Sequence, residues 1–179
     1  MHTVARKNTA TAEGGGLWNS AAGKMTISRS VIRDNVASGA DADQGGGGLF
    51  NDGADGSGGT LEVIRSVVLD NTADGAAGSG GGILNNQGTL EVTRSRIDGN
   101  RSMRAGGGIE ANVGLTDLDR TVLIRNTTGA APGNGGGLHL TGAGTVKVDR
   151  SQVLRNDAAA EGGGLWNCAT GTMRVTRSN

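Results

Sequence analysis

The chain has 179 residues, a length that suits one domain, and its 35 glycines and single proline do not follow the Gly-X-Y period of collagen. The formal net charge of +0 excludes a global field that would attract nucleic acid, and no apolar run is long enough to insert into a membrane as a helix. No apolar signal-peptide segment opens the chain, and its single cysteine, Cys168, excludes an internal disulfide.

Taken in chain order, three short blocks recur, and each is a predicted strand. The first is a glycine triplet followed by a mostly aliphatic segment, as in "GGGLFN", and it begins at Gly14, Gly46, Gly80, Gly106, Gly135 and Gly162. The second resembles "GTLEVIRS" and ends in Arg-Ser or Arg-Thr, and the third resembles "VIRDN" and ends in asparagine. All three alternate apolar and polar residues and are too short for helices, so they predict strands.

The length of the unit varies mainly in one place, between the asparagine of the third block and the next glycine triplet. Fixed strands with one elastic loop per turn are typical of a parallel β-helix, whose successive turns stack about 4.8 Å apart and favour a right-handed path. We therefore expect residues 1–179 to form one all-β domain. It would be a single-stranded right-handed parallel β-helix of about six turns, each with three short strands, and with open ends.

Aliphatic residues recur at one position of each block, which predicts inward columns that fill the core. The column of the first block comprises Leu17, Leu49, Ile83, Ile109, Leu138 and Leu165. One column of the second block is interrupted in the fourth unit, where Thr116 stands in place of an aliphatic residue.

The repeats "GGGL…VIRDN" and "GGGILNNQGTLEVTRSRIDGN" resemble those of polymorphic outer-membrane proteins and of large secreted bacterial surface proteins. The resemblance covers nearly the whole chain and implies a pectin-lyase-like, right-handed β-helix. It also implies a secreted or cell-surface setting, as part of a longer precursor such as an autotransporter passenger. The expected function is then a non-catalytic structural or adhesive segment. The alternative is a module that binds or cleaves polysaccharides.

An asparagine closes the third block of each unit, and stacked amide side chains can hydrogen-bond from turn to turn. We predict a structural ladder of Asn8, Asn35, Asn71, Asn100, Asn126 and Asn156. The asparagine that follows Trp18 is expected to join a second, partial ladder.

An arginine closes the second block of each unit, and stacking predicts an outward row of cations about 4.8 Å apart. The row comprises Arg29, Arg65, Arg94, Arg120, Arg150 and Arg177. It would bind sulfated glycans, lipopolysaccharide or nucleic-acid phosphates, or else form a solvated corner paired with acidic residues of the same strands. The acidic candidates are Glu62, Glu91, Asp117, Asp119 and Asp149.

A second outward column contains the three aromatic residues Trp18, Phe50 and Trp166, and Glu110 interrupts it. Exposed aromatic rings stack on sugars or on a partner protein. The alternative is that these rings pack locally beneath the long loops. Glycans and a host or surface protein are therefore the partners expected from this column.

The sequence contains no clear pair of a nucleophile and a base. We therefore favour a protein that is not an enzyme, and we expect no cofactor. Calcium is a weak candidate at the acidic loops, through Asp41, Asp43, Asp52 and Asp55. The alternative for these residues is simple solvation of the loops.

The first and last units share the string "AEGGGLWN". This similarity predicts a longer array of which the chain is a part. Unpaired strands at open ends favour end-to-end association between β-helices.

Overall fold

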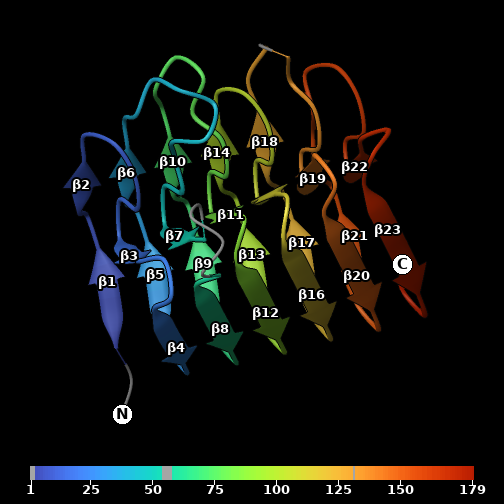
Figure 1. Cartoon of the computed structure of the whole chain (residues 1–179), viewed down its shortest axis with the longest axis horizontal. Coiled ribbons are helices and arrows are strands. Elements are labelled where there is room, and N and C mark those ends of the chain that lie inside the picture. The colour runs from blue at the N-terminus through green and yellow to red at the C-terminus, as the bar shows by residue number, and fades with distance from the viewer. Residues whose placement is uncertain (1–2, 54–57, 131) are drawn as a thin grey trace.

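The structure, a computed structural model, describes residues 3–53, 58–130 and 132–179. Every regular element in these ranges is a β-strand, and the strands form four parallel sheets that stack as a right-handed β-solenoid of about six turns (Figure 1). The expected all-β, parallel fold is therefore confirmed. We name the sheets A to D in the order in which each turn of the chain visits them.

Three sheets correspond to the three predicted blocks. Sheet A contains β1 (Val4–Arg6), β5 (Val31–Arg33), β9 (Val67–Leu69), β13 (Arg96–Asp98), β17 (Val122–Ile124) and β21 (Gln152–Leu154). Sheet C contains β3 (Leu17–Asn19), β7 (Leu49–Asp52), β11 (Ile83–Asn86), β15 (Ile109–Asn112), β19 (Leu138–Thr141) and β22 (Leu165–Asn167). Sheet D contains β4 (Lys24–Ser28), β8 (Thr60–Ile64), β12 (Thr89–Thr93), β16 (Leu115–Asp119), β20 (Thr145–Asp149) and β23 (Thr172–Thr176).

Sheet B is an addition to the expected three strands per turn. Its strands are two residues long and directly follow the asparagine column. They are β2 (Thr9–Ala10), β6 (Val36–Ala37), β10 (Thr72–Ala73), β14 (Arg101–Ser102) and β18 (Thr127–Thr128). A strand of two residues is too short to show a period of its own, which is why the sequence pattern did not reveal it.

The turns stack in register, so equivalent residues of successive turns are neighbours. Val63 of β8 lies beside Val92 of β12, and both are fully buried. Similar columns from sheets A, C and D meet inside the solenoid and form one apolar core. Burial of one aliphatic side chain contributes roughly 1.5–3 kcal/mol, and every interior turn contributes several such side chains.

The glycine triplet is required by close backbone packing. The first glycine of each triplet has a φ between 61° and 65° in all six turns, a conformation that glycine adopts without strain. A Cβ on Gly47, the second glycine of its triplet, would lie 2.4 Å from the Thr72 carbonyl oxygen and 2.5 Å from that of Gly81. No other residue type fits that position without moving backbone.

The predicted asparagine ladder is present. The Nδ2 of each asparagine from Asn8 to Asn126 donates to the Oδ1 of the asparagine in the next turn, over 2.9–3.0 Å. The acceptor Oδ1 also takes a hydrogen bond from the backbone N–H of the donating asparagine: the Asn71 N–H donates to the Oδ1 of Asn100 over 3.0 Å. These paired polar groups are buried in the middle of the ladder, so they stabilise turn stacking instead of opposing it.

A serine and threonine ladder follows the arginine column and was not foreseen. The N–H of Ser66 donates to the Oγ of Ser95 over 3.0 Å, and that Oγ donates to the Thr93 carbonyl over 2.9 Å. The ladder therefore fixes the backbone directly after each arginine.

Thr116, the polar residue in one of the aliphatic core columns, lies where the second asparagine ladder is interrupted. Asn19 donates to Asn51 and Asn51 donates to Asn85, each over 2.8 Å, but the next position of sheet C is Ala111. Asn85 instead donates to the buried Thr116 hydroxyl over 3.2 Å. The irregular residue in the core column therefore completes the ladder where the asparagine is missing.

Candidate functional site

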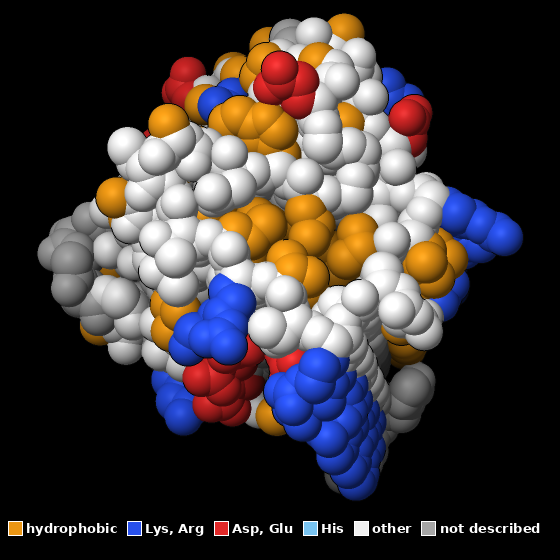
Figure 2. Space-filling model, turned by 90° about the vertical axis from the view of Figure 1, so that its right-hand side faces the viewer, with side chains coloured by type: hydrophobic (Ala, Val, Ile, Leu, Met, Phe, Trp, Pro, Cys, Tyr) orange, Lys and Arg blue, Asp and Glu red, His pale blue; other side chains and the backbone are white. Residues whose placement is uncertain are grey.

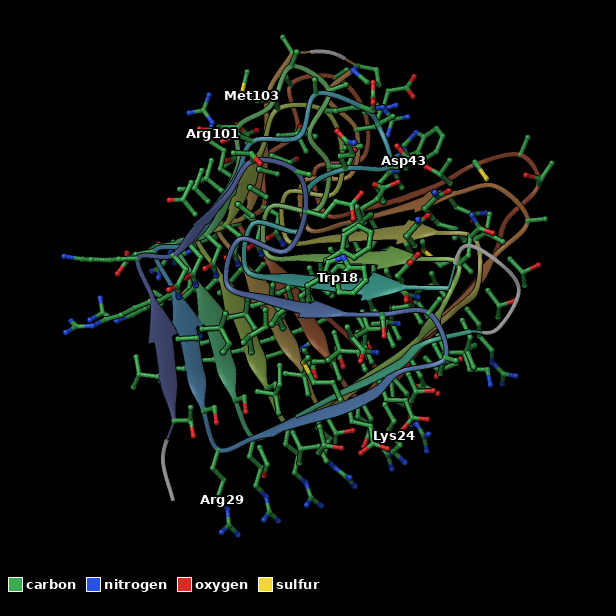
Figure 3. All side chains as sticks on the ribbon, turned by 60° about the vertical axis from the view of Figure 1, so that its left-hand side comes forward. Trp18, Lys24, Arg29, Asp43, Arg101 and Met103 are labelled. Carbon is green, nitrogen blue, oxygen red and sulfur yellow. The ribbon has the colours of Figure 1, made fainter. Side chains whose placement is uncertain are left out.

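The predicted arginine row forms the corner between sheets D and A. We call it the arginine ridge: Arg29, Arg65, Arg94, Arg120, Arg150 and Arg177. All six have a φ between 48° and 51° and an exposed side chain. Figure 3 shows a row of side chains that extends into solvent from this corner, starting at Arg29. The backbone of the corner is held alike along the ridge, for example by the Arg65 N–H, which donates to the Thr93 carbonyl over 2.9 Å.

This left-handed corner is not a natural place for arginine. A side chain with a Cβ pays roughly 1–2 kcal/mol in this region, and glycine or asparagine would fit better. The corner between sheets A and B provides a comparison, since its φ lies between 52° and 62°. That corner is occupied in turn by Lys7, Asp34, Asp70, Gly99, Arg125 and Arg155. The same backbone conformation therefore accepts varied residues, so the conformation alone does not select arginine.

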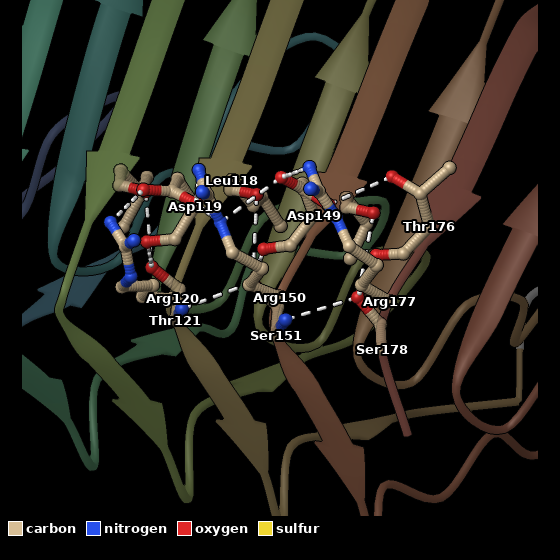
Figure 4. Close-up of polar contacts among 12 residues, drawn as sticks. Leu118, Asp119, Arg120, Thr121, Asp149, Arg150, Ser151, Thr176, Arg177 and Ser178 are labelled. Carbon is tan, nitrogen blue, oxygen red and sulfur yellow. Dashed lines mark hydrogen bonds and ion pairs between the residues drawn. The ribbon is translucent and has the colours of Figure 1, made fainter.

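Three arginines of the ridge form ion pairs, and we call Arg120, Arg150 and Arg177 the paired half (Figure 4). Asp119 contacts Arg120 at 3.1 Å and Arg150 at 2.6 Å. Asp149 contacts Arg150 at 3.1 Å and accepts a hydrogen bond from Arg177 Nε over 2.8 Å. The hydrogen bond from Arg177 lowers the pKa of Asp149 from 3.8 to about 2, and the hydrogen bond from Thr176 makes a smaller contribution to this decrease.

The other three arginines, Arg29, Arg65 and Arg94, form the free half of the ridge. None of them makes an ion pair with any residue that the structure describes. The preceding residues in their strands are Ser28, Ile64 and Thr93, where the later turns have Asp119 and Asp149. An acid at this position contacts the arginine of its own turn and that of the next turn, so Arg177, which follows Thr176, is paired through Asp149. Figure 2 shows a continuous band of Lys and Arg side chains along one edge of the molecule, with acidic side chains beside it.

A shallow groove of about 550 Å³ lies on the outward face of sheet D beside the paired half. Its walls carry Glu91 and Asp117 as well as Lys147 and Arg174. The opposite charges face each other across a small space, so this groove offers no consistent charge to a ligand.

The aromatic column is only partly exposed. Trp18 is 46% exposed and stacks at 6.3 Å on Phe50, which is only 2% exposed. Trp166 is half-buried, and its Nε1 donates to Glu161 over 3.0 Å. Of the two alternatives for this column, local packing therefore holds for Phe50, whose ring is covered and stacks on Trp18, and an exposed ring remains only at Trp18 among these two.

Two polar residues of the same column form a buried cluster that the sequence pattern missed. Glu110 and His139 are 1% and 3% exposed, and the His139 Nδ1 lies 2.9 Å from a Glu110 carboxylate oxygen. Thr141 donates to the same carboxylate over 2.8 Å, and Trp166 stacks on the imidazole at 4.3 Å. The alignment of the repeat units could have indicated this cluster, because it places Glu110 and His139 at equivalent positions, which lie side by side in adjacent strands.

This cluster does not have the geometry of a nucleophile activated by a base. The Thr141 Oγ1 lies 3.0 Å from Nδ1 of His139, the same nitrogen that Glu110 contacts. A catalytic relay needs the acid on one ring nitrogen and the nucleophile on the other. The arrangement pairs buried polar groups with one another.

No group of three or more His, Cys, Asp or Glu side chains that would hold a metal ion occurs in residues 3–53, 58–130 and 132–179. Of the acidic residues considered for calcium, Asp55 lies outside the described residues. The same ranges contain no helix long and apolar enough to cross a membrane.

Both ends of the solenoid present sheet edges. In sheets A, C and D, β1, β3 and β4 pair only with the following turn, and β21, β22 and β23 only with the preceding one. Core residues there are partly exposed, including Leu17 and Met25 at one end and Met173 at the other. End-to-end association stays a prediction.

No protein-family model matches this chain, and no curated protein or solved structure matches it either.

Proposed function

We propose that this chain is a non-catalytic structural and adhesive segment of a bacterial secreted or cell-surface protein. In this proposal the solenoid acts as a stiff rod that holds side chains in fixed outward rows. The observation that carries it is the asparagine ladder, in which each interior amide hydrogen-bonds both neighbouring turns. Such a ladder serves stacking alone and leaves the outer surface for binding.

The distribution of titratable groups also supports a non-catalytic role. Polysaccharide-cleaving enzymes need a pair of carboxylates, or a carboxylate with a base, gathered around one bond. Asp119 and Asp149 are held by arginines, and Glu62 is held by Lys24 at 3.1 Å. The buried Glu110 is committed to His139 and Thr141.

The rod role can be tested through unfolding. Asn71→Ala removes an interior ladder member and leaves the N–H of Asn35 and the carbonyl of Ile32 without their partner. Such a loss costs about 2–4 kcal/mol. Asn8→Ala at the edge is the matched control and should cost below about 1 kcal/mol. Equal effects in urea unfolding would contradict a structural ladder.

Turnover assays separate the proposal from the enzymatic alternative. We expect the purified chain to cleave neither neutral nor acidic polysaccharides. Turnover that disappears when one surface carboxylate is changed to its amide would overturn the non-catalytic role.

The alternative of a polysaccharide-binding module is favoured by one specific observation, the free half of the arginine ridge. It is compatible with a stiff rod, because recognition would use only the outer surface.

A further inference from the structure

We propose that the free half of the arginine ridge, Arg29, Arg65 and Arg94, binds a linear acidic polysaccharide that lies along the solenoid axis. This inference names a ligand for the adhesive role proposed above and rests on it. The chemistry recognised is a row of carboxylate or sulfate groups on one extended polymer.

The first support is the repeated arginine at a left-handed corner. Arg65 and Arg94 have φ values of 49° and 50°, which are costly for any residue with a Cβ. The other left-handed corner of the same turns carries Asp70 and Gly99 instead. The backbone therefore does not select arginine, and in the free half its guanidinium has no carboxylate partner among the described residues.

The second support is geometric. Stacked strands place equivalent residues about 4.8 Å apart, so the three arginines project from successive turns as one row along the axis (Figure 3). Each guanidinium can hold a carboxylate or sulfate through two parallel hydrogen bonds. A small anion would meet one arginine, whereas a polymer with repeated charges would meet all three at once and gain from multivalency.

The third support is what surrounds the row. On the sheet D side the row is flanked by Ser28, Ile64 and Thr93, and the two hydroxyls suit sugar hydroxyls. On the sheet A side it is flanked by Val31, Val67 and Arg96, and Arg96 is paired with Asp98 at 2.8 Å.

Asp119 lies beside Thr93 in the next turn, but its carboxylate is held by Arg120 and Arg150. On the strands of the free half itself the nearest acidic column begins at Glu62, three residues before Arg65. That separation is about 10 Å along the strand, roughly one Debye length at moderate salt.

The same surroundings argue against single-stranded nucleic acid. Proteins that bind it combine a cationic groove with aromatic rings on which the bases stack. The three aromatic residues of this chain all lie in sheet C, away from the corner between sheets D and A. The row therefore suits a ligand that needs charge and hydroxyl recognition without stacking.

The test uses the whole chain and four immobilised probes: heparin, polygalacturonate, neutral dextran and oligothymidylate. We expect binding to at least one of the two acidic polysaccharides and none to dextran. Heparin alone would assign sulfate recognition, and polygalacturonate alone would assign carboxylate recognition. Equal or tighter binding to oligothymidylate, or no binding to either polysaccharide, would overturn the proposal.

Matched variants locate the site. R29Q/R65Q/R94Q should weaken polysaccharide binding about 10- to 100-fold, since each exposed ion pair contributes a modest factor. R120Q/R150Q/R177Q removes the same charge from the paired half and should change binding less than about 3-fold. Equal losses in the two variants would overturn the assignment to the free half.

Thermal unfolding of both variants serves as the control that each remains folded.

The proposed structural role and the proposed ligand can fail separately. A chain that unfolds cooperatively and shows the interior ladder effect, but binds no acidic polysaccharide, would keep its structural role and lose this ligand.

Discussion

The two halves of the arginine ridge have the same backbone and the same residue, yet different electrostatics. Arg65 and Arg150 have φ values of 49° and 48°, and each donates its backbone N–H to the next turn. They differ because Ile64 precedes Arg65, whereas Asp149 precedes Arg150 and Asp119 contacts Arg150 from the turn before. A solenoid fixes which residues stack, and a single outward position then decides whether the stacked charges are cancelled or available.

The largest effect is expected when carboxylates are moved into the free half. I64D/T93D places an acid beside Arg65 and Arg94 in the position that Asp119 and Asp149 have in the later turns. New ion pairs and the added negative charge should weaken binding to an acidic polysaccharide about 10- to 100-fold. The measurement is the Kd on an immobilised polysaccharide.

The control for that variant is T9D/T72D, which adds two acids to sheet B. It should leave the Kd within about 3-fold of the unaltered chain. A loss as large as that of I64D/T93D would show that only total charge matters.

The converse change should extend the free half. D119N/D149N removes the carboxylates that contact Arg120, Arg150 and Arg177 and leaves six available guanidinium groups. We expect binding to tighten by up to about 10-fold. E91Q/D117N makes the same change in charge on the same sheet without freeing a ridge arginine, so it should tighten binding less.

Relief of backbone strain gives a smaller effect, which differs in size between the two halves. Arg65→Asn places a residue that tolerates a positive φ at an unpaired corner, so the free energy of unfolding should rise by about 0.5–1 kcal/mol while binding weakens. Arg150→Asn also loses contacts to Asp119 and Asp149, so its net gain should be smaller. Urea unfolding of both variants measures the difference, and an equal gain in both would show that the ion pairs add no stability.

The smallest effect is expected from mild acid. The pKa of Asp149 is lowered to about 2, so its contribution to stability is complete above its ordinary pKa of 3.8 and is lost as the pH falls towards 2. Between pH 7 and pH 4 the carboxylate therefore stays ionised and continues to neutralise Arg177. Titration of Asp149 by carboxyl NMR should show no protonation in that range, and a midpoint above pH 4 would contradict the pairing.

The sequence predicted the elements whose patterns repeat and missed those that depend on tertiary placement. The glycine triplets and the asparagines at the ends of the third blocks mark fixed points in each turn, so the parallel solenoid and the ladder followed from them. The strand Thr9–Ala10 carries no pattern, and the burial of Phe50 depends on a covering loop path that no local rule gives.

The candidate site was likewise only partly predictable. The ridge itself follows from the position of Arg-Ser and Arg-Thr in each unit. Five acidic residues were equally good candidates for its partners, but the structure pairs Asp119 and Asp149 with ridge arginines and Glu62 with Lys24. Which partner forms depends on side-chain reach from the neighbouring column, a property that spacing in the sequence does not specify.

The central claim is that only the first half of the ridge is available to a ligand. The most direct measurement is the chemical shift of each arginine Nε–H by NMR during titration with an acidic polysaccharide. The resonances of Arg29, Arg65 and Arg94 should shift together with one saturation curve, while those of Arg120, Arg150 and Arg177 stay in place. Equal shifts along all six arginines, or shifts confined to Trp18 and Trp166, would contradict the claim.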